Sequence, residues 1–495
     1  MNLAVEAEPR DAAAVILTRS NEICWARRSL SLSFLGGWHA FPGGKLERSD
    51  AESAVRNCDH LELAALITCA ARECFEETGV LLNRGGEKLT RGQRASLHDD
   101  LISGRFSFAE ILKNWDLWLD AQDFSFIGAW TTPSFSPVRF KTHFFLAACP
   151  TKQKPFAASG ELETVEFITP ETALEKWMRG KILCAPPILN ALRVFSESNI
   201  QSPDFQVKKL LSLAERDGVR PRKIEINPHV TVFPVKTLTL PPATHTNCFI
   251  VGHQEFVVID AASPFDREQA VLHQAINAII ADGGVCQAII VSHLHPDHIG
   301  GETVLQKHLR ENHRQNVPLA AHRLTAEKLL HIRFDRYLED NEMLNLRDAV
   351  GAKFTLQVLH TPGHARGHLS FYLEQFGFLL ASDNVVGAGS VLIAPPEGNL
   401  VDYLSSLKRL QNLPNLRFLC GSHGAAIANA KEKIAGYITH RLEREQQILA
   451  ARNDGAQTLR EIVERVYTNI NPELLPFAEK SVAAHLEKLT TEQKI

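Results

Sequence analysis

Short apolar runs predict the first strands of the chain. Residues 11–19 (DAAAVILTR) read as a buried strand, and residues 126–133 (FIGAWTTP) and 139–148 (RFKTHFFLAA) read as two more strands around a turn that contains proline. Residues 165–181 (VEFITPETALEKWMRGK) predict a strand, a turn and a helix. Strands and helices mixed in this way indicate an α/β or α+β domain.

One stretch in this region has helical spacing instead. Residues 61–79 (LELAALITCAARECFEETG) predict a helix of about 18 residues, with Asp59 or Asn57 as its N-cap and Gly79 as its C-cap.

The pattern changes twice further along the chain. Residues 199–222 carry Ser, Pro, Asp and Arg without a clear period, so we place a domain boundary there. From Lys431 the chain becomes helical, with a long helix over 431–455 and shorter ones over 458–468 and 474–489. Between these points, strands alternate with helices, which predicts an α/β domain with a mixed sheet. Its strands are TNCFIVG, EFVVIDAA, QAIIVSH, FTLQVLH, FGFLLASD and LRFLCGSH.

Composition narrows the class of protein. A chain of 495 residues is long enough for two to four domains, and 44% hydrophobic with 22% charged residues is typical of a soluble globular protein. The net charge of −4 gives no overall basic field for nucleic acid or membrane. No signal peptide and no apolar run of roughly 20 residues are evident, so we expect no membrane partner and a cytoplasmic location. Nine scattered cysteines without a C-x-x-C pair indicate a reducing compartment.

Histidine and aspartate gather at the ends of four predicted strands. Because sites in open α/β sheets form beyond the carboxyl ends of strands, we expect these side chains to converge. Five imidazoles and two carboxylates without a thiolate exceed the needs of one tetrahedral ion. They predict a catalytic site for two ions, zinc or else iron or manganese. The seven residues are His293, His295, Asp297, His298, His364, Asp383 and His423.

These motifs resemble those of the metallo-β-lactamase-fold hydrolases. The matching stretches are HLHPDH, TPGH, ASD and GSHG, with Asp260 in VVIDAA at an early strand end. The resemblance implies an αββα sandwich over residues 225–430, with Asp260 as a structural residue and Asp297 as a catalytic one. We predict that His368 is structural. The implied ligand sets are His293, His295 and His364 for one metal, and Asp297, His298 and His423 for the other, with Asp383 as the bridge.

The helical tail, residues 431–495, resembles the winged-helix segment that follows this fold in the beta-lactamase-like protein 2 group. Members of that group include endoribonucleases, and close structural relatives cleave thioesters. The tail contains ten Lys/Arg and ten Asp/Glu residues, whereas nucleic-acid contacts normally rely on clustered cations. We therefore favour a packing or dimerisation role for the tail, the latter in a homo-oligomer.

Three glutamates at the end of the first helix form a second candidate site. Glu73, Glu76 and Glu77 share one helix face because residues three and four positions apart are neighbours. Their spacing alone fits either a solvated acidic face or a magnesium site.

The stretch RECFEETGVLL resembles the second half of the Nudix box. FPGGKLERSD supplies Gly44 and, six positions on, Asp50 where the box has Glu, and 21 residues separate Asp50 from Arg72. This interrupted box resembles that of the coenzyme A diphosphatase branch, over residues 8–200. The resemblance implies an α/β/α sandwich that holds Mg²⁺ or Mn²⁺, and Asp50 would loosen one metal contact. By this resemblance, Glu73, Glu76 and Glu77 are metal ligands, and Glu76 and Glu77 are also catalytic. Arg72, Gly44 and Gly79 are structural residues. The catalytic base is unassigned, with Glu163 or Glu166 as a candidate.

Together the two resemblances predict a metal-dependent hydrolase with two sites. The N-terminal site would cleave a nucleoside-diphosphate-linked substrate such as coenzyme A. The C-terminal site would cleave an ester, thioester or phosphodiester, so a small phosphate-bearing or coenzyme A-type molecule would suit both. In the alternative, the C-terminal half is an endoribonuclease that acts on RNA, and the Nudix half senses a nucleotide without cleaving it.

Overall fold

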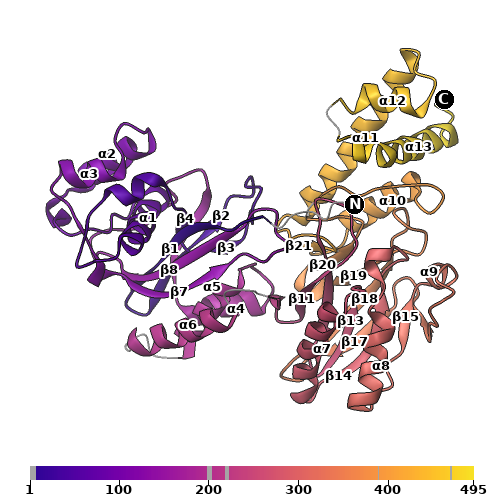
Figure 1. Ribbon diagram of the computed structural model, residues 1–495, viewed down its shortest axis with the longest axis horizontal. Helices are drawn as coiled ribbons and strands as arrows, with labels where there is room; N and C mark the ends of the chain where they lie inside the picture. The colour runs from indigo at the N-terminus through magenta and orange to yellow at the C-terminus, as the bar shows by residue number, and fades with distance from the viewer. Residues whose placement is uncertain (1–6, 198–202, 218–221, 388, 469–470) are drawn as a thin grey trace. The chain divides into compact units, whose positions relative to one another are not determined.

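The computed structural model describes residues 7–197, 203–217, 222–387, 389–468 and 471–495. The chain divides into two compact units that meet in the sequence at Asn227 and Pro228 (Figure 1). None of the helices in the described residues is both long and apolar enough to cross a bilayer.

A mixed sheet forms the centre of the N-terminal unit. Along the sheet the order is β3 (His39–Ala40), β2 (Glu22–Arg28), β1 (Arg10–Arg19), β8 (Phe140–Ala148) and β7 (Ser125–Thr131). In addition, β4 (Gly43–Lys45) pairs with β1, and β9 (Leu162–Ile168) pairs with β2. Strand β1 runs parallel to β8 and antiparallel to β2.

Helices cover both faces of this sheet. Successive side chains of a strand point to opposite faces, and in β1 the residues Val15 and Leu17 join the core with α1 (Leu61–Thr78), α2 (Arg91–Ile102) and α3 (Phe108–Asn114). Ala14 and Ile16 join the core with α4 (Pro170–Met178), α5 (Pro186–Glu197) and α6 (Pro203–Asp217). The unit is therefore an α/β/α sandwich.

One local expectation in this unit was wrong. The N-cap of α1 is His60, neither Asp59 nor Asn57. Asn57 has a φ of 58° and donates its side-chain amide to Asp120, so it belongs to the preceding turn. Helix α6 occupies much of the segment that showed no clear period, because Leu210 and Ala214 bury one face of it.

The C-terminal unit contains a large mixed sheet that divides into two halves. One half consists of β11 (Val230–Lys236), β12 (His245–Gly252), β13 (Glu255–Ile259), β14 (Val285–Val291), β15 (Leu319–Ala321) and β16 (Arg336–Tyr337). The other consists of β17 (Met343–Arg347), β18 (Lys353–His360), β19 (Leu369–Leu373), β20 (Phe378–Ser382) and β21 (Phe418–Gly421). The pairing of β13 with β17 at Glu255 and Arg347 links the two halves.

Each half is buried on both faces. In β12, Ile250 packs in a core with helices α7 (Asp266–Ala281) and α8 (Glu302–His313), while its neighbour Phe249, on the opposite face, is equally buried. In β20, Leu379 packs in a core with α10 (Leu400–Gln411) and α11 (Ala430–Asn453), and its neighbour Leu380 is buried as well. This is the αββα sandwich of the metallo-β-lactamase fold.

Three helices form the tail: α11, α12 (Leu459–Val466) and α13 (Leu475–Thr491). They enclose a small core that includes Ile448, Val463 and Val482. No strand lies among the tail residues that the structure describes, 430–468 and 471–495. Helix α11 runs from α10 to the helices α12 and α13 of the tail (Figure 1). It belongs to two cores, because Ile434 near its start packs on α10 and Ile448 near its end packs in the tail.

Candidate metal centre

The loops that follow four strands carry the seven side chains identified from the sequence. A loop after β14, which includes the short helix η4 (Pro296–His298), carries the H-x-H-x-D-H motif. His364 lies four residues after β18, and Asp383 directly follows β20. His423 follows β21, which runs parallel to β20. The structure brings all seven side chains together in three overlapping groups of the kind that hold a metal ion.

The first group joins His293, His295 and His364. The Nδ1 atom of His295 lies 3.0 Å from Nε2 of His293 and 2.8 Å from Nε2 of His364. Three nitrogens that point at one another at such distances present their lone pairs to a single point. A divalent cation prefers such a donor set.

The second group joins Asp297, His298 and His423, and Asp383 lies between the two groups. One oxygen of Asp297 is 3.4 Å from Nε2 of His423. Oδ1 of Asp383 is 3.5 Å from Nε2 of His298, and Oδ2 of Asp383 is 3.5 Å from Nε2 of His364. Asp383 thus turns one oxygen to each group, as a bridging ligand would.

Hydrogen bonds to the outer nitrogens of the rings set their tautomers. Nδ1 of His364 donates to the carbonyl of Leu392 at 2.8 Å, and Nδ1 of His423 donates to the carbonyl of His245 at 2.8 Å. A carbonyl can only accept, so Nδ1 must carry the proton and Nε2 keeps its lone pair for the centre. These carbonyls leave no side-chain signal, and sequence reasoning missed them.

Asp260 and Ser292 fix two more rings. The buried Asp260 carboxylate accepts from the Ser292 hydroxyl at 2.7 Å and from Nδ1 of His298 at 2.9 Å. Because the Ser292 proton is used on Asp260, its oxygen accepts from Nδ1 of His293 at 3.0 Å. His368 is different, since its Nε2 accepts the Asp383 backbone N–H at 3.1 Å and is not free to bind a metal.

Electrostatics divides the histidines into two kinds. Burial lowers the pKa of His295 to about 3, and the nearby His364 ring adds to this. Burial opposes charge on His423 too, but Asp383 and Asp297 outweigh it and raise the pKa of His423 to about 10. Without a metal, His295 is therefore neutral, whereas the carboxylates favour a second proton on Nε2 of His423, and a metal at that nitrogen would displace it.

Unpartnered atoms at the centre show that the donor set fits cations. Nε2 of His298 and Oδ1 of Asp383 are buried and face each other at 3.5 Å, and neither makes a hydrogen bond within the described residues. Leaving such polar atoms unsatisfied costs free energy, about 1–3 kcal/mol each. A divalent cation between them would satisfy both, and the donors left over suffice for a second ion.

Arg72, the arginine of the N-terminal candidate site, makes several buried hydrogen bonds. Its Nε donates to one oxygen of Asp50 at 2.8 Å, and its Nη2 donates to the other at 3.0 Å. Its Nη1 donates to Glu73 at 2.9 Å and to Glu76 at 3.0 Å. Both oxygens of Asp50 accept from Arg72, so Asp50 holds this arginine in place, and its effect on a metal contact stays a prediction.

The three glutamates do not converge as the histidines do. Glu73 and Glu76 share Arg72, whereas Glu77 accepts the backbone N–H of Gly43 at 2.9 Å. No group of Glu73, Glu76 and Glu77 meets the geometry of the C-terminal groups within the described part of the chain. Burial raises the pKa of Glu73 to about 7 and that of Glu77 to about 8. A cation would favour their ionised forms.

Two glycines shape this site. A Cβ on Gly44 would lie 2.3 Å from the Glu73 carboxylate, so any larger residue there would displace that carboxylate. Gly79 ends α1 with a φ of 67° and donates its N–H to the Phe75 carbonyl at 2.9 Å.

The proposed bases of this site have other partners. Glu163 pairs with Arg27 and accepts the backbone N–H of Leu30. Glu166 accepts from Trp25 and pairs with Lys176, and these contacts lower the pKa of Glu166 although burial opposes the shift. Neither has a contact with the glutamates of α1 that would mark it as the base.

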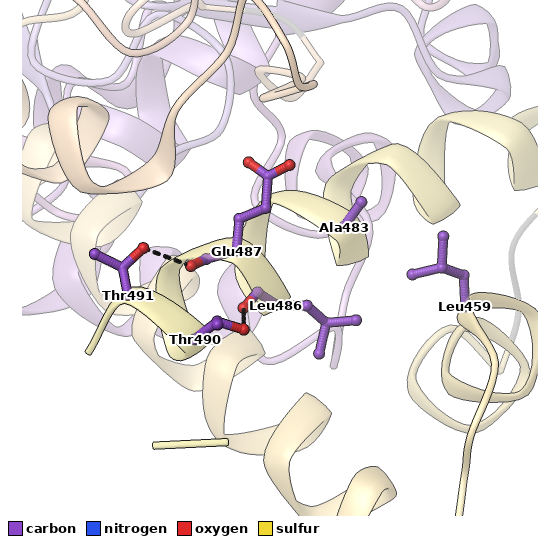
Figure 2. A pocket seen from close by; sticks show the side chains of 6 residues that line it. All are labelled: Leu459, Ala483, Leu486, Glu487, Thr490 and Thr491. Carbon is purple, nitrogen blue, oxygen red and sulfur yellow. Dashed lines mark hydrogen bonds between the residues drawn. The ribbon is translucent and has the colours of Figure 1, made fainter. Parts of the chain in front are cut away.

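A shallow pocket lies between α12 and α13 in the tail (Figure 2). The hydroxyls of Thr490 and Thr491 donate to carbonyls of their own helix, as the dashed lines in Figure 2 show. The described lining includes one carboxylate, Glu487, and no lysine or arginine. This pocket therefore offers little to a phosphate backbone. The remaining lining residues are Leu459, Ala483 and Leu486.

Comparison with known families agrees with the sequence motifs. Residues 59–194 match the family model of the NUDT19 Nudix domain, and residues 241–423 match that of the metallo-beta-lactamase superfamily. Residues 458–495 match the beta-lactamase associated winged helix domain.

Similar curated proteins cover the C-terminal half. The beta-lactamase-like protein 2 homolog of Drosophila melanogaster is 27% identical over 262 residues, 50% of this chain and 84% of that protein. An atrochrysone carboxyl ACP thioesterase of Pseudocercospora fijiensis is 28% identical over 232 residues, 45% of this chain and 62% of that protein. Among solved structures, a beta-lactamase domain protein from Burkholderia ambifaria has a TM-score of 0.48 at 21% identity, over 55% of this chain and 88% of that one.

The fold, the ligand cluster and the matching family models define a metal-dependent hydrolase. The chain joins a NUDT19-type Nudix domain to a metallo-beta-lactamase domain that carries a beta-lactamase associated winged helix. The family resemblances predicted from the motifs are therefore confirmed.

Proposed function

We propose that the C-terminal half cleaves a thioester with two zinc ions, and that the N-terminal half cleaves a diphosphate with magnesium or manganese. The buried, unpartnered pair of His298 Nε2 and Asp383 Oδ1 carries the proposal, because such atoms inside a seven-donor cluster indicate a site built for cations. The proposed domains are residues 8–200, 225–430 and 431–495. Iron or manganese would suit the same C-terminal donors.

The residues of the centre have separate proposed roles. When bound, two divalent ions would lower the pKa of water to about 7 and polarise the substrate oxygen. His293, His295 and His364 would hold one ion, His298 and His423 the other, and Asp383 both. Asp297 would hold the second ion together with His298 and His423, and its partly exposed carboxylate would also accept a proton from the attacking water.

At the N-terminal site, Glu73, Glu76 and Glu77 would hold the ion that neutralises the diphosphate. Arg72 would orient Glu73 and Glu76 without touching the substrate, because every nitrogen of its guanidinium already donates to the protein. Glu76 is the most exposed of the three carboxylates that contact Arg72, so it is the best placed to reach substrate.

A coenzyme A-type substrate would suit both sites. Coenzyme A contains a diphosphate, and its acylated form contains a thioester, so a single molecule offers one bond to each site. The named thioesterase among the similar proteins supports a thioester for the C-terminal site. An ester or phosphodiester would meet the same donors.

Reciprocal variants of the full-length protein test the proposal. After removal of metals and reloading with zinc and magnesium, the protein is given an acyl-coenzyme A, coenzyme A and single-stranded RNA. We expect His295→Ala to lose thioester cleavage and keep diphosphate cleavage. We expect Glu76→Gln to show the opposite pattern.

Other outcomes would redirect the function. Intact thioester together with cleaved RNA in the zinc or manganese form would show an endoribonuclease. Coenzyme A that binds by calorimetry but is not cleaved would show a sensing Nudix domain. The sensing Nudix domain is the second candidate function. The observation that favours it is that Glu73 and Glu76 both accept hydrogen bonds from Arg72.

A further inference from the structure

We propose that helix α11 of the tail positions the metal ligands, through Arg441 and Tyr437. The inference rests on the proposed metal centre and adds two residues to it that lie outside every metal motif. It also gives the tail a role in the hydrolase that does not require nucleic acid.

Arg441 lies where α11 passes from one core to the other. Its side chain is buried, and its Nη2 donates to the carbonyl of Val391, in the segment 389–399 that precedes α10. The carbonyl of the next residue, Leu392, accepts from Nδ1 of His364 at 2.8 Å. Arg441 is therefore one peptide unit from the group that sets the tautomer and ring plane of a metal ligand.

Tyr437, one helical turn earlier, holds the chain that follows Asp383. Its hydroxyl donates to the Val386 carbonyl at 3.2 Å and lies 3.4 Å from the Val386 N–H. The next residue, Gly387, donates its N–H to the carbonyl of His423 at 2.7 Å. Tyr437 thus holds the turn between Asp383 and Gly387, and Gly387 in turn contacts the second proposed ligand, His423.

Helix α10 contributes to the same frame. The hydroxyl of Tyr403 donates to the Asn384 carbonyl at 2.7 Å, directly after Asp383. The guanidinium of Arg441 lies 5.5 Å from the centre of the Tyr403 ring. Arg441 therefore ties α10, α11 and the segment 389–399 together.

A role in packing alone does not explain an arginine at this position. Taking a guanidinium out of water costs free energy, and a buried apolar side chain of similar volume would avoid that cost. Nε of Arg441 even lacks a hydrogen-bond partner among the described residues. Arginine supplies a hydrogen bond to the Val391 carbonyl, which leucine or methionine at this position could not. Direct hydrogen-bond partners of metal ligands commonly change metal affinity 10- to 100-fold, and Arg441 acts one peptide unit beyond such a partner, the Leu392 carbonyl.

The experiment compares three variants of the full-length protein. Arg441→Met removes the bond to Val391, and Tyr437→Phe removes only a hydroxyl. Arg444→Met is the matched control on the same helix, because Arg444 donates to the Val466 carbonyl at 2.9 Å and stacks on Tyr467, both within the tail. Arg441→Lys tests rescue by a side chain that can still donate to a carbonyl.

The readouts are zinc affinity, by competition with a chromophoric chelator, and the visible spectrum of the cobalt-loaded protein, with thermal unfolding of each metal-free variant. We expect Arg441→Met to lose about tenfold or more in zinc affinity and to change the cobalt spectrum. We expect Tyr437→Phe to lose less, Arg441→Lys to recover part of the loss, and Arg444→Met to match wild type.

Two results would overturn the inference. Arg441→Met and Tyr437→Phe could both bind zinc with wild-type affinity and spectrum, which would leave them a structural role alone. Arg444→Met could lose as much affinity as Arg441→Met, which would show a general effect of the tail. Wild-type protein that binds no metal would instead refute the proposed centre itself. Should Arg441→Met fail to fold, the milder Tyr437→Phe still decides between positioning and packing.

Discussion

Replacing Asp50 with Asn tests the buried ion pair that anchors the glutamate helix. Asp50 and Arg72 are both buried, and the two oxygens of Asp50 receive two nitrogens of Arg72 at 2.8 and 3.0 Å. Oδ2 of Asp50 also accepts the backbone N–H of Glu47 at 2.8 Å. Asn at this position would lack the negative charge, and its NH2 group would face the N–H donors of Arg72 or Glu47.

The size of the effect follows from the burial of the pair. Breaking a buried pair by removing one partner costs about 3–5 kcal/mol, because it leaves an uncompensated buried charge. Arg72 keeps Glu73 and Glu76, so we expect the lower end, about 3 kcal/mol. With a urea dependence of about 2 kcal/mol/M, the unfolding midpoint should fall by about 1.5 M.

Tryptophan fluorescence isolates this transition. All six tryptophans lie between residues 25 and 177, in the N-terminal unit, so their signal reports that unit alone. Urea titrations of wild type and Asp50→Asn, each followed by fluorescence, give the two midpoints. The tryptophans are Trp25, Trp38, Trp115, Trp118, Trp130 and Trp177.

Glu175→Gln is the matched control. Glu175 pairs with Arg179 on α4, and both side chains are more than half exposed, so the loss should be within about 0.5 kcal/mol. A midpoint for Asp50→Asn within about 0.3 M of wild type would refute the argument that this pair anchors the helix.

Three further predictions concern other parts of the chain. Gly44→Ala places a methyl group 2.3 Å from Glu73, so the magnesium needed for half-maximal diphosphate cleavage should rise about tenfold; an unchanged magnesium curve would contradict this. Asp260→Asn removes the carboxylate that orients His298, so elemental analysis should find one zinc where wild type holds two, and retention of both would argue against the assignment. Burial lowers the pKa of His485 to about 3, whereas the same side chain in the unfolded chain has a pKa of about 6.5. As the pH falls from about 6.5 toward 3, only the unfolded chain binds a proton at His485, so the free energy of unfolding decreases over this range. The free energy of unfolding, measured by circular dichroism, should therefore fall less between pH 7 and pH 5 in His485→Leu than in wild type. An equal fall in both proteins would count against this prediction.

The sequence revealed the candidate metal ligands because each follows an apolar strand. A strand is recognisable from its run of apolar residues, and a His or Asp directly after it must lie at the sheet edge. The same logic could not reveal the carbonyls of Leu392 and His245, since every residue has a carbonyl. Arg441 was hidden in a different way, because a charged residue within a helix usually faces solvent.

Local signals also failed where tertiary contacts decided the outcome. Asn57 is a good N-cap residue by type, yet its amide is used by Asp120, so the helix begins later. Asp50 stands where the resembling motif has a glutamate, and the weaker metal contact expected from the shorter side chain stays a prediction. Only the fold shows that its oxygens meet Arg72, because the two residues are distant in the sequence.

The order of the proposed metal ligands along the chain has a consequence for when the sites can be completed during synthesis. Three imidazoles lie between residues 293 and 298, whereas His423 follows 130 residues after His293. At about 5–20 residues per second, a ribosome needs roughly 7–26 s to add that segment. During this interval the nascent chain displays a partial set of donors. Both proposed metal sites can be complete only after β21 and, by our inference, α11 have left the ribosome. Correct binding of two ions is therefore expected only after these segments have been made.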